Sequence, residues 1–177
     1  LTSILPKNIN HMFFSNSGSE AVDSALKIAL AYYKAKGKVS KTKFIGRSRG
    51  YHGSGFGGTS VGGIVANRQQ YGNLLNGVIH LPHTHIPAKN SFSWGQPKHG
   101  KEKADALNEI IDFHGKETIA AVIVEPIAGS TGVLVPPQGY LEKLRKICSE
   151  NDILLIFDEV ITGFGRVGAS FASNRFG

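Results

Sequence analysis

Two apolar stretches of the chain each end at a carboxylate. Residues 153–157 are followed by Asp158 and Glu159, and residues 119–124 are followed by Glu125. Apolar runs of this length are typical of strands buried on both faces of a parallel sheet. In such sheets, ligands bind outside the carboxyl ends of the strands. We therefore expect Asp158 to carry its negative charge into a ligand crevice, where it would face a cation.

The local sequence leaves several chemistries open for these acids. Two carboxylates at neighbouring strand ends could act as general acid and base, or could bind a metal ion. An apolar strand followed by Asp-Glu also describes the magnesium-binding strand of nucleoside triphosphatases. That class requires a phosphate-binding loop of the form G-x-x-x-x-G-K-[ST] upstream. The glycines from Gly53 to Gly58 are followed by Thr59-Ser60 instead, so this reading is rejected.

A second candidate site is the Ser/Gly turn at residues 15–20, which precedes an amphipathic helix. Ser17 or Ser19 can cap this helix, and Gly37 is expected to end it. A short strand at residues 11–14 is expected just before the turn. The free N–H groups at a helix start attract anions, so the turn could hold a phosphate, although an ordinary helix cap explains the same residues.

The glycine-rich segment from Gly46 to Gly63 contains two further motifs that lack their required context. Residues 53–58 match the dinucleotide-binding pattern G-x-G-x-x-G, but no strand directly precedes them. Residues 58–62 match the nucleophile elbow G-x-S-x-G, but no histidine follows Asp158, as that class requires. The pair Tyr51-His52 remains. It could form a stacking surface for a flat ligand, or simply cover the core.

Other chemistry is disfavoured by composition. The net charge of +7 comes from scattered Lys and Arg without interleaved aromatics, so nucleic-acid binding is not expected. His80, His83 and His85 lack a completing carboxylate or cysteine, so no metal site is expected. Cys148 falls on the apolar stripe of a predicted helix and should be a buried, inert thiol. One cysteine allows no internal disulfide, and no apolar run spans a membrane, so a cytoplasmic protein is expected.

The elements that would position these residues alternate between strands and helices. Further strands are expected at residues 43–45 and 77–81, and further helices at 104–114 and 139–150. This alternation predicts a three-layer α/β domain. Strand, helix and strand from Ile119 to Phe157 form a βαβ unit, whose strands are parallel. Glu125 and Asp158 should therefore lie at the same edge of the sheet.

Four motifs in a fixed order carry a family resemblance: Phe14-Ser-Asn-Ser-Gly-Ser-Glu-Ala21, Gly50-Tyr-His-Gly53, Val124-Glu-Pro-Ile127 and Asp158-Glu-Val-Ile-Thr-Gly-Phe-Gly-Arg166. Together they resemble the class III, pyridoxal-phosphate (PLP)-dependent aminotransferases over essentially the whole chain. The further matches at residues 60–65, 81–85 and 128–133 are most similar to the ω-amino acid:pyruvate (β-alanine:pyruvate) branch.

The resemblance implies a role for each candidate residue. Asp158 would pair with the pyridinium nitrogen of PLP and keep it protonated. Gly18 and Ser19 would bind the phosphate at the helix start, with Ser17 as cap. The remaining implied cofactor contacts are Tyr51 and Val160 on the two ring faces, His52 along the wall, Glu125 near Asp158, and Ile161. Many relatives carry Gln where this chain has Ile161, so another group must contact the ring hydroxyl. Arg166 would hold the following loop.

The resemblance also implies what surrounds these residues. Residues 1–177 would form part of the large domain of a fold type I PLP-dependent transferase. The N-terminal segment, the Schiff-base lysine and the small C-terminal domain would lie outside the chain, which alone would not turn over. The full-length parent would be a homodimeric transaminase that passes an amino group to pyruvate and forms alanine. The loops at 47–63 and 84–100 are candidates for the dimer interface. Alternatives are a non-catalytic cofactor-binding fragment and a sister PLP activity such as an aminomutase, racemase or decarboxylase.

Overall fold

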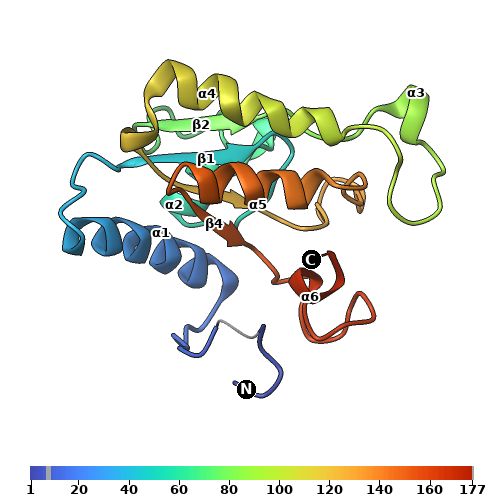
Figure 1. Ribbon diagram of the computed structural model, residues 1–177, viewed down its shortest axis with the longest axis horizontal. Coiled ribbons are helices and arrows are strands. Elements are labelled where there is room, and N and C mark those ends of the chain that lie inside the picture. Colours follow the sequence, from blue (N-terminus) through green and yellow to red (C-terminus); the bar gives the residue numbers. More distant parts are fainter. Residues whose placement is uncertain (7–8, 177) are drawn as a thin grey trace.

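A four-stranded parallel sheet forms the centre of the molecule (Figure 1). The computed structural model describes residues 1–6 and 9–176. The strands are β1 (Lys43–Arg47), β2 (Val78–Leu81), β3 (Ile119–Val124) and β4 (Leu154–Phe157), in the spatial order β2-β1-β3-β4. All three strand pairs are parallel, which confirms the α/β class expected from the sequence.

Helices cover both faces of the sheet, and strand β3 shows why. All six of its residues are buried. Ala121 and Ile123 pack with helix α1 (Gly18–Ala35), whereas Val122 and Val124 pack with α4 (Ala106–His114) and α5 (Tyr140–Glu150). Side chains of a strand alternate between its faces, so a strand buried on both faces must be apolar throughout. The remaining helices are the shorter α2 (Phe56–Val61), α3 (Pro87–Asn90) and α6 (Ala172–Phe176), and 3₁₀ turns occupy Val65–Asn67, Lys101–Asp105 and Lys116–Thr118.

Helix α1 begins and ends where the sequence predicts. Its N-cap Ser17 has extended backbone angles, and its hydroxyl accepts a hydrogen bond from the Glu20 N–H at 3.2 Å. The Glu20 carboxylate reaches back to the Asn16 N–H at 2.9 Å, much as in a capping box. At the other end, Gly37 has φ +73° and its N–H bonds to the Lys34 carbonyl, as is usual after a helix C-terminus.

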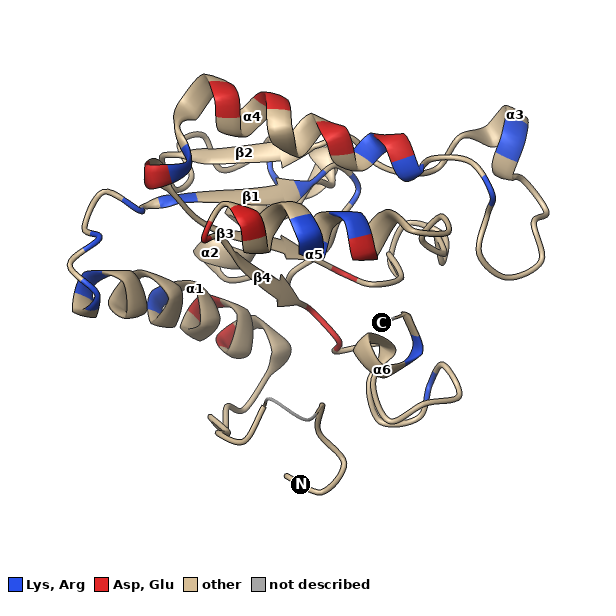
Figure 2. Cartoon of the chain, viewed as in Figure 1, with Lys and Arg blue, Asp and Glu red and all other residues tan. Residues whose placement is uncertain are grey.

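The carboxyl ends of the strands meet at one edge of the sheet. Val124 of β3 lies opposite Phe157 of β4, so Glu125 and Asp158 leave the sheet side by side. The Asp158 N–H also donates to the Val124 carbonyl at 3.0 Å. Strand β1 has β2 on one side and β3 on the other, which makes its carboxyl end the switch point at which parallel sheets bind ligands. Figure 2 shows the acidic segment that follows β4.

The structure differs from two sequence-based expectations. Residues 11–14 do not form a strand. No neighbouring strand pairs with them in the described part of the chain, and Phe13 and Phe14 are 69% and 77% exposed. Residues 153–157 were expected to be buried on both faces, but all four residues of β4 are only half-buried. Strand β4 is the outermost of the four strands, and among the described residues it pairs with β3 alone.

Candidate functional site

A pocket of about 230 Å³ opens at the carboxyl edge of the sheet. Its lining residues come from the start of α1, the loops after β1 and β3, and the end of β4: Gly18, Ser19, Tyr51, His52, Gly53, Glu125, Ser130, Asp158, Val160 and Ile161. Eight of the nine candidate residues line it, and Ser17 is the exception because it caps α1. Four segments far apart in sequence therefore converge on one cavity.

Asp158 is held in a fixed orientation inside this pocket. Its Oδ2 lies 2.9 Å from Nδ1 of His52, and its Oδ1 accepts the Val160 N–H at 3.2 Å. The two side chains are almost fully buried, with exposed fractions of 0% for His52 and 8% for Asp158. An ionised carboxylate can accept about four hydrogen bonds, so two acceptor positions are left for a cationic or N–H group in the cavity.

The tautomer of His52 follows from this contact. A carboxylate can only accept, so Nδ1 carries the hydrogen of the His52–Asp158 bond. Nε2 of His52 is buried and has no hydrogen-bond partner among the described residues. Sequence reasoning placed His52 on the pocket wall but did not predict its bond to Asp158, which pairs residues 106 positions apart.

The start of helix α1 closes one end of the pocket. Gly18 and Ser19 are its first two residues, so their N–H groups lack partners within the helix and suit an anion. The Ser19 hydroxyl accepts the Ser54 N–H at 3.0 Å, which ties the loop after β1 to the helix. Gly53 has φ +92°, and a Cβ there would lie 2.5 Å from the Ser19 Oγ. Only glycine allows this backbone conformation and this close approach together.

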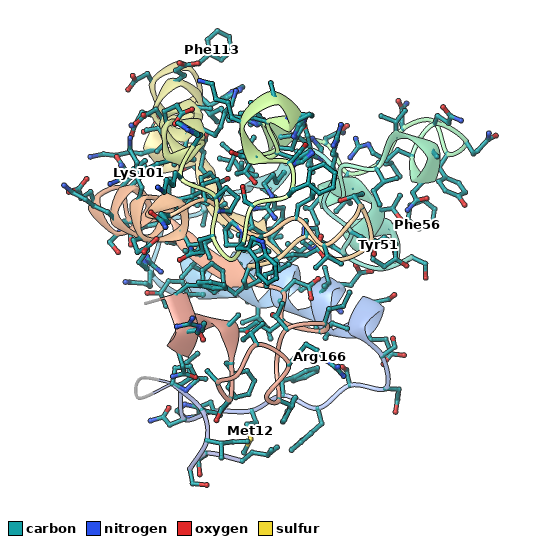
Figure 3. The ribbon with its side chains drawn as sticks, turned by 90° about the vertical axis from the view of Figure 1, so that its right-hand side faces the viewer. Met12, Tyr51, Phe56, Lys101, Phe113 and Arg166 are labelled. Atoms are coloured by element: carbon teal, nitrogen blue, oxygen red, sulfur yellow. The ribbon has the colours of Figure 1, made fainter. Side chains whose placement is uncertain are left out.

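Apolar surface is left uncovered on the pocket walls. Tyr51 is 39% exposed, Val160 69% and Ile161 49%. Val160 packs beside Gly18, where an added Cβ would be 3.0 Å from a Val160 methyl carbon. Figure 3 shows Tyr51 near the edge of the molecule, on the same side as Phe56. Large exposed apolar groups around a buried carboxylate suit a flat ligand that carries a positive group.

Glu159 holds the loop after β4, a role that sequence reasoning assigned to Arg166. Glu159 Oε1 accepts the Ser173 N–H at 3.1 Å, and Oε2 accepts the Ala172 N–H and the Thr162 hydroxyl. Arg166 is exposed (Figure 3), and its side chain makes no hydrogen bond or ion pair with the described residues. In the sequence, Glu159 is marked only by its position next to Asp158. Its partners in α6 lie more than ten residues away and meet it only in the folded chain.

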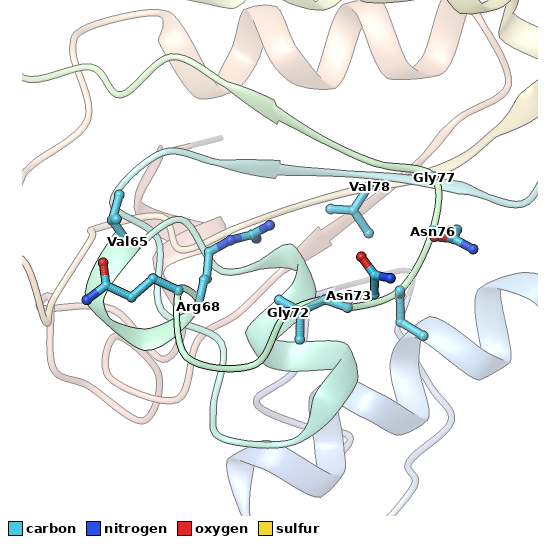
Figure 4. A pocket seen from close by; sticks show the side chains of 10 residues that line it. Val65, Arg68, Gly72, Asn73, Asn76, Gly77 and Val78 are labelled. Atoms are coloured by element: carbon cyan, nitrogen blue, oxygen red, sulfur yellow. The ribbon is translucent and has the colours of Figure 1, made fainter.

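A larger cavity of about 470 Å³ lies away from these residues, between the segment after α2 and the start of β2 (Figure 4). Its charged side chain, Arg68, is already engaged: Nη1 donates to the Ser60 and Gly62 carbonyls at 2.5 and 2.7 Å. Ser60 is fully buried and bonds to the Phe56 carbonyl within α2, which agrees with rejecting it as a nucleophile. We therefore assign this cavity no chemistry.

The remaining titratable candidates have structural surroundings. Cys148 is buried, as expected, and burial raises the pKa of its thiol to about 12. Burial also lowers the pKa of His80, whose Nε2 lies 2.9 Å from the Gly62 carbonyl. The described residues contain no group of three side chains that could hold a metal ion. Within the same residues, no helix is both long and apolar enough to cross a membrane.

The parallel sheet with helices on both faces has the fold of the fold type I PLP-dependent transferases. The family model for class III aminotransferases matches residues 1–177, and the chain belongs to that family. It is 64% identical over 177 residues to the omega-aminotransferase of Caulobacter vibrioides, covering 100% of this chain and 40% of that protein. It is 52% identical over 178 residues to the omega-amino acid–pyruvate aminotransferase of Pseudomonas putida, covering 100% and 39%.

Solved structures agree with the fold. The omega transaminase of Pseudomonas jessenii in complex with PMP superposes with a TM-score of 0.84 at 42% identity. That match covers 93% of this chain and 36% of the other. The chain thus spans about two fifths of the length of the curated relatives it matches.

Proposed function

We propose that the full-length protein is a PLP-dependent transaminase that moves an amino group from an ω-amino acid, such as β-alanine, to pyruvate and forms alanine. The observation that carries this proposal is the buried Asp158 carboxylate, held by His52 and Val160 in the same pocket as the start of α1. The names of the Caulobacter and Pseudomonas relatives support the transfer chemistry and the substrate class.

The residues present fit PLP, which is a flat ring with a phosphate and a basic ring nitrogen. The N–H groups of Gly18 and Ser19 at the start of α1 would bind the phosphate. Tyr51 would cover one face of the ring and Val160 the other, which would bury both exposed side chains. Asp158 would take the ring nitrogen, and Ile161 would contact the ring edge. Ser17 would act only through its cap of α1.

When bound, PLP supplies an electron sink that accepts the charge left as the substrate loses a proton. The contribution of this chain is to make the ring a good sink. An opposite charge in a dry site favours the protonated form of a basic nitrogen, and Asp158 provides that charge from a nearly buried position. His52 donates to the carboxylate and keeps it aimed, while the walls exclude water. None of the described residues that line the pocket is a lysine.

We also propose that the protein works as a homodimer in the cytoplasm. Phe92 and Trp94 in the 84–100 segment are both 99% exposed, and Phe56 at the start of α2, in the 47–63 segment, is 70% exposed. Large aromatic side chains are enriched in protein–protein interfaces, which supports contact of these loops with a second copy. The single buried thiol of Cys148 fits a reducing compartment.

An absorbance titration of the full-length protein with PLP tests the proposed function. The absorbance band of the bound cofactor should fall on adding β-alanine and return on adding pyruvate, with alanine formed in equal amount. A protein that binds PLP but responds to no amine would be the non-catalytic module. Release of carbon dioxide, or rearranged or racemised substrate without alanine, would identify a sister activity. Each of these results would overturn the transaminase proposal.

A further inference from the structure

Glu125 joins two loops that flank the pocket. Its Oε1 accepts the Tyr51 N–H at 2.8 Å, and its Oε2 accepts the Gly129 N–H at 2.9 Å. Tyr51 follows β1 and Gly129 follows β3, so one side chain bridges the ends of two neighbouring strands. Both carboxylate oxygens are thus engaged, and Glu125 is 4% exposed. Among the described residues, the Asp158 carboxylate has other partners, His52 and the Val160 N–H.

Glu125 itself is fixed by its neighbours. The Arg47 Nη2 donates to the Glu125 backbone carbonyl at 2.8 Å, and Arg47 is only 3% exposed. The Arg47 guanidinium carbon lies 5.9 Å from the centre of the Tyr140 ring, in the core beneath the site. The backbone of Glu125 is therefore fixed to the sheet, whereas its carboxylate contacts the two loops.

The loop held at Gly129 carries a second pocket wall. A Cβ added at Gly129 would lie 2.5 Å from Cδ1 of Ile161, so Ile161 rests directly on this backbone. Ser130, the next residue, lines the pocket. Through its two bonds, Glu125 fixes the backbone of Tyr51 on one wall and the support of Ile161 and Ser130 on another.

We propose that Glu125 is a positioning residue that sets the separation of the Tyr51 and Gly129 loops before the cofactor arrives. This inference rests on the proposed PLP site and assigns Glu125 an indirect role in it. A carboxylate is required because both partners are N–H donors. A glutamine of the same shape has one oxygen and one NH₂ group, so it can accept a hydrogen bond from only one loop. Its NH₂ group would face the N–H of the other loop, and two donors cannot bond.

The test is amide hydrogen exchange in the full-length protein without PLP, comparing wild type with Glu125→Gln. Exchange at the Tyr51 or the Gly129 amide should accelerate by about tenfold or more, because one bond to a charged acceptor is lost. The amides of Val122 and Ile123 in β3 should keep their protection. The control is Glu142→Gln, an exposed residue of α5 outside the pocket, which should change neither site.

The second readout concerns the loaded protein. In Glu125→Gln, the dissociation constant of PLP should rise and the visible circular dichroism of the bound cofactor should shrink, since Tyr51 no longer holds one ring orientation. A destabilised but correctly positioned site would lose protection everywhere and keep the dichroism of its bound fraction. That pattern would overturn the inference, as would unchanged exchange at both amides.

A milder variant covers the case in which Glu125→Gln fails to fold. Glu125→Asp keeps the charge but is one methylene shorter, so it cannot reach both N–H groups and should release one of them. Intact protection at both amides in Glu125→Asp would overturn the inference. If wild-type protein binds no PLP, the proposed function fails, whereas the exchange results still decide whether Glu125 sets the two loops.

Discussion

His52 Nδ1 lies 2.9 Å from Asp158 Oδ2, and the two side chains are almost completely buried. Asp158 directly follows β4, the outermost of the four described strands. The bond to His52, from the loop after β1, spans the sheet edge and ties the acid to its central strands. The charge that would face the cofactor is thereby given a defined direction.

Replacement of His52 by Phe removes the hydrogen bond and keeps a flat ring. We expect kcat of the full-length transaminase to fall roughly tenfold to a hundredfold, the range for losing a bond to a charged acceptor. The matched control is His11→Phe, since His11 is exposed, outside the pocket and outside the proposed interface loops. Steady-state kinetics with β-alanine and pyruvate measure the effect. Equal kcat values for the two variants would show that the His52 bond does not orient Asp158 for catalysis.

Gly53→Ala tests the packing of the loop after β1 against the start of α1. A side chain at φ +92° costs about 1–2 kcal/mol, and its Cβ would also overlap Ser19. We expect lower stability and weaker PLP binding. Gly72→Ala is the control, because Gly72 also has positive φ, +60°, but has open space around it. Its stability should fall without a change in PLP affinity. A Gly53→Ala protein that binds PLP as tightly as wild type would contradict the proposed contact.

Glu159→Ala should release the loop between β4 and α6. The carboxylate accepts from the Ala172 and Ser173 N–H groups and from Thr162, so its loss leaves three donors without their partner. Limited proteolysis should then cut between residues 160 and 171 faster than in wild type. Glu150→Ala is the control, since Glu150 is an exposed residue with one long ion pair of 3.8 Å. Equal cleavage rates in both variants would show that something else holds the loop.

Lys41→Met should destabilise the fold at the sheet edge opposite the pocket. The Lys41 Nζ donates to the carbonyls of Lys116, Ile119 and Asp152, and the side chain is 5% exposed. Loss of three such bonds should reduce the free energy of unfolding by about 3 kcal/mol, measured by denaturant unfolding.

The matched control for Lys41 is Lys38→Met. Lys38 pairs with Asp152 at 2.7 Å, but both side chains are 46% exposed, and exposed ion pairs contribute about 0–1 kcal/mol. Similar losses for Lys38→Met and Lys41→Met would refute the difference in burial as the cause.

The sequence predicted those features that depend on local pattern. The apolar run of β3 indicated a fully buried strand, and the βαβ order placed Glu125 and Asp158 at one edge, as the strand register confirms. The cap at Ser17 and the terminal Gly37 followed from residue type alone. In each case the deciding physics acts within a few residues or within one strand–helix–strand unit.

The features that the sequence could not predict depend on contacts between distant segments. The bonds from His52 to Asp158 and from Glu125 to Tyr51 and Gly129 form only when the loops after β1 and β3 meet. The prediction of a strand at residues 11–14 was wrong because a strand needs a pairing partner, which the local sequence does not reveal. The half-buried state of β4 depends on which segments pack against it, and its apolar run does not encode them.

The most direct test of the account is Asp158→Asn in the full-length protein, followed by the single-turnover reaction of the PLP-loaded enzyme with β-alanine. Asn keeps the size of the side chain but removes the charge that would hold the ring nitrogen protonated. If Asp158 keeps the ring nitrogen protonated, the rate should fall by about a hundredfold or more, with PLP still bound. A rate equal to that of wild type would contradict the central role given to Asp158.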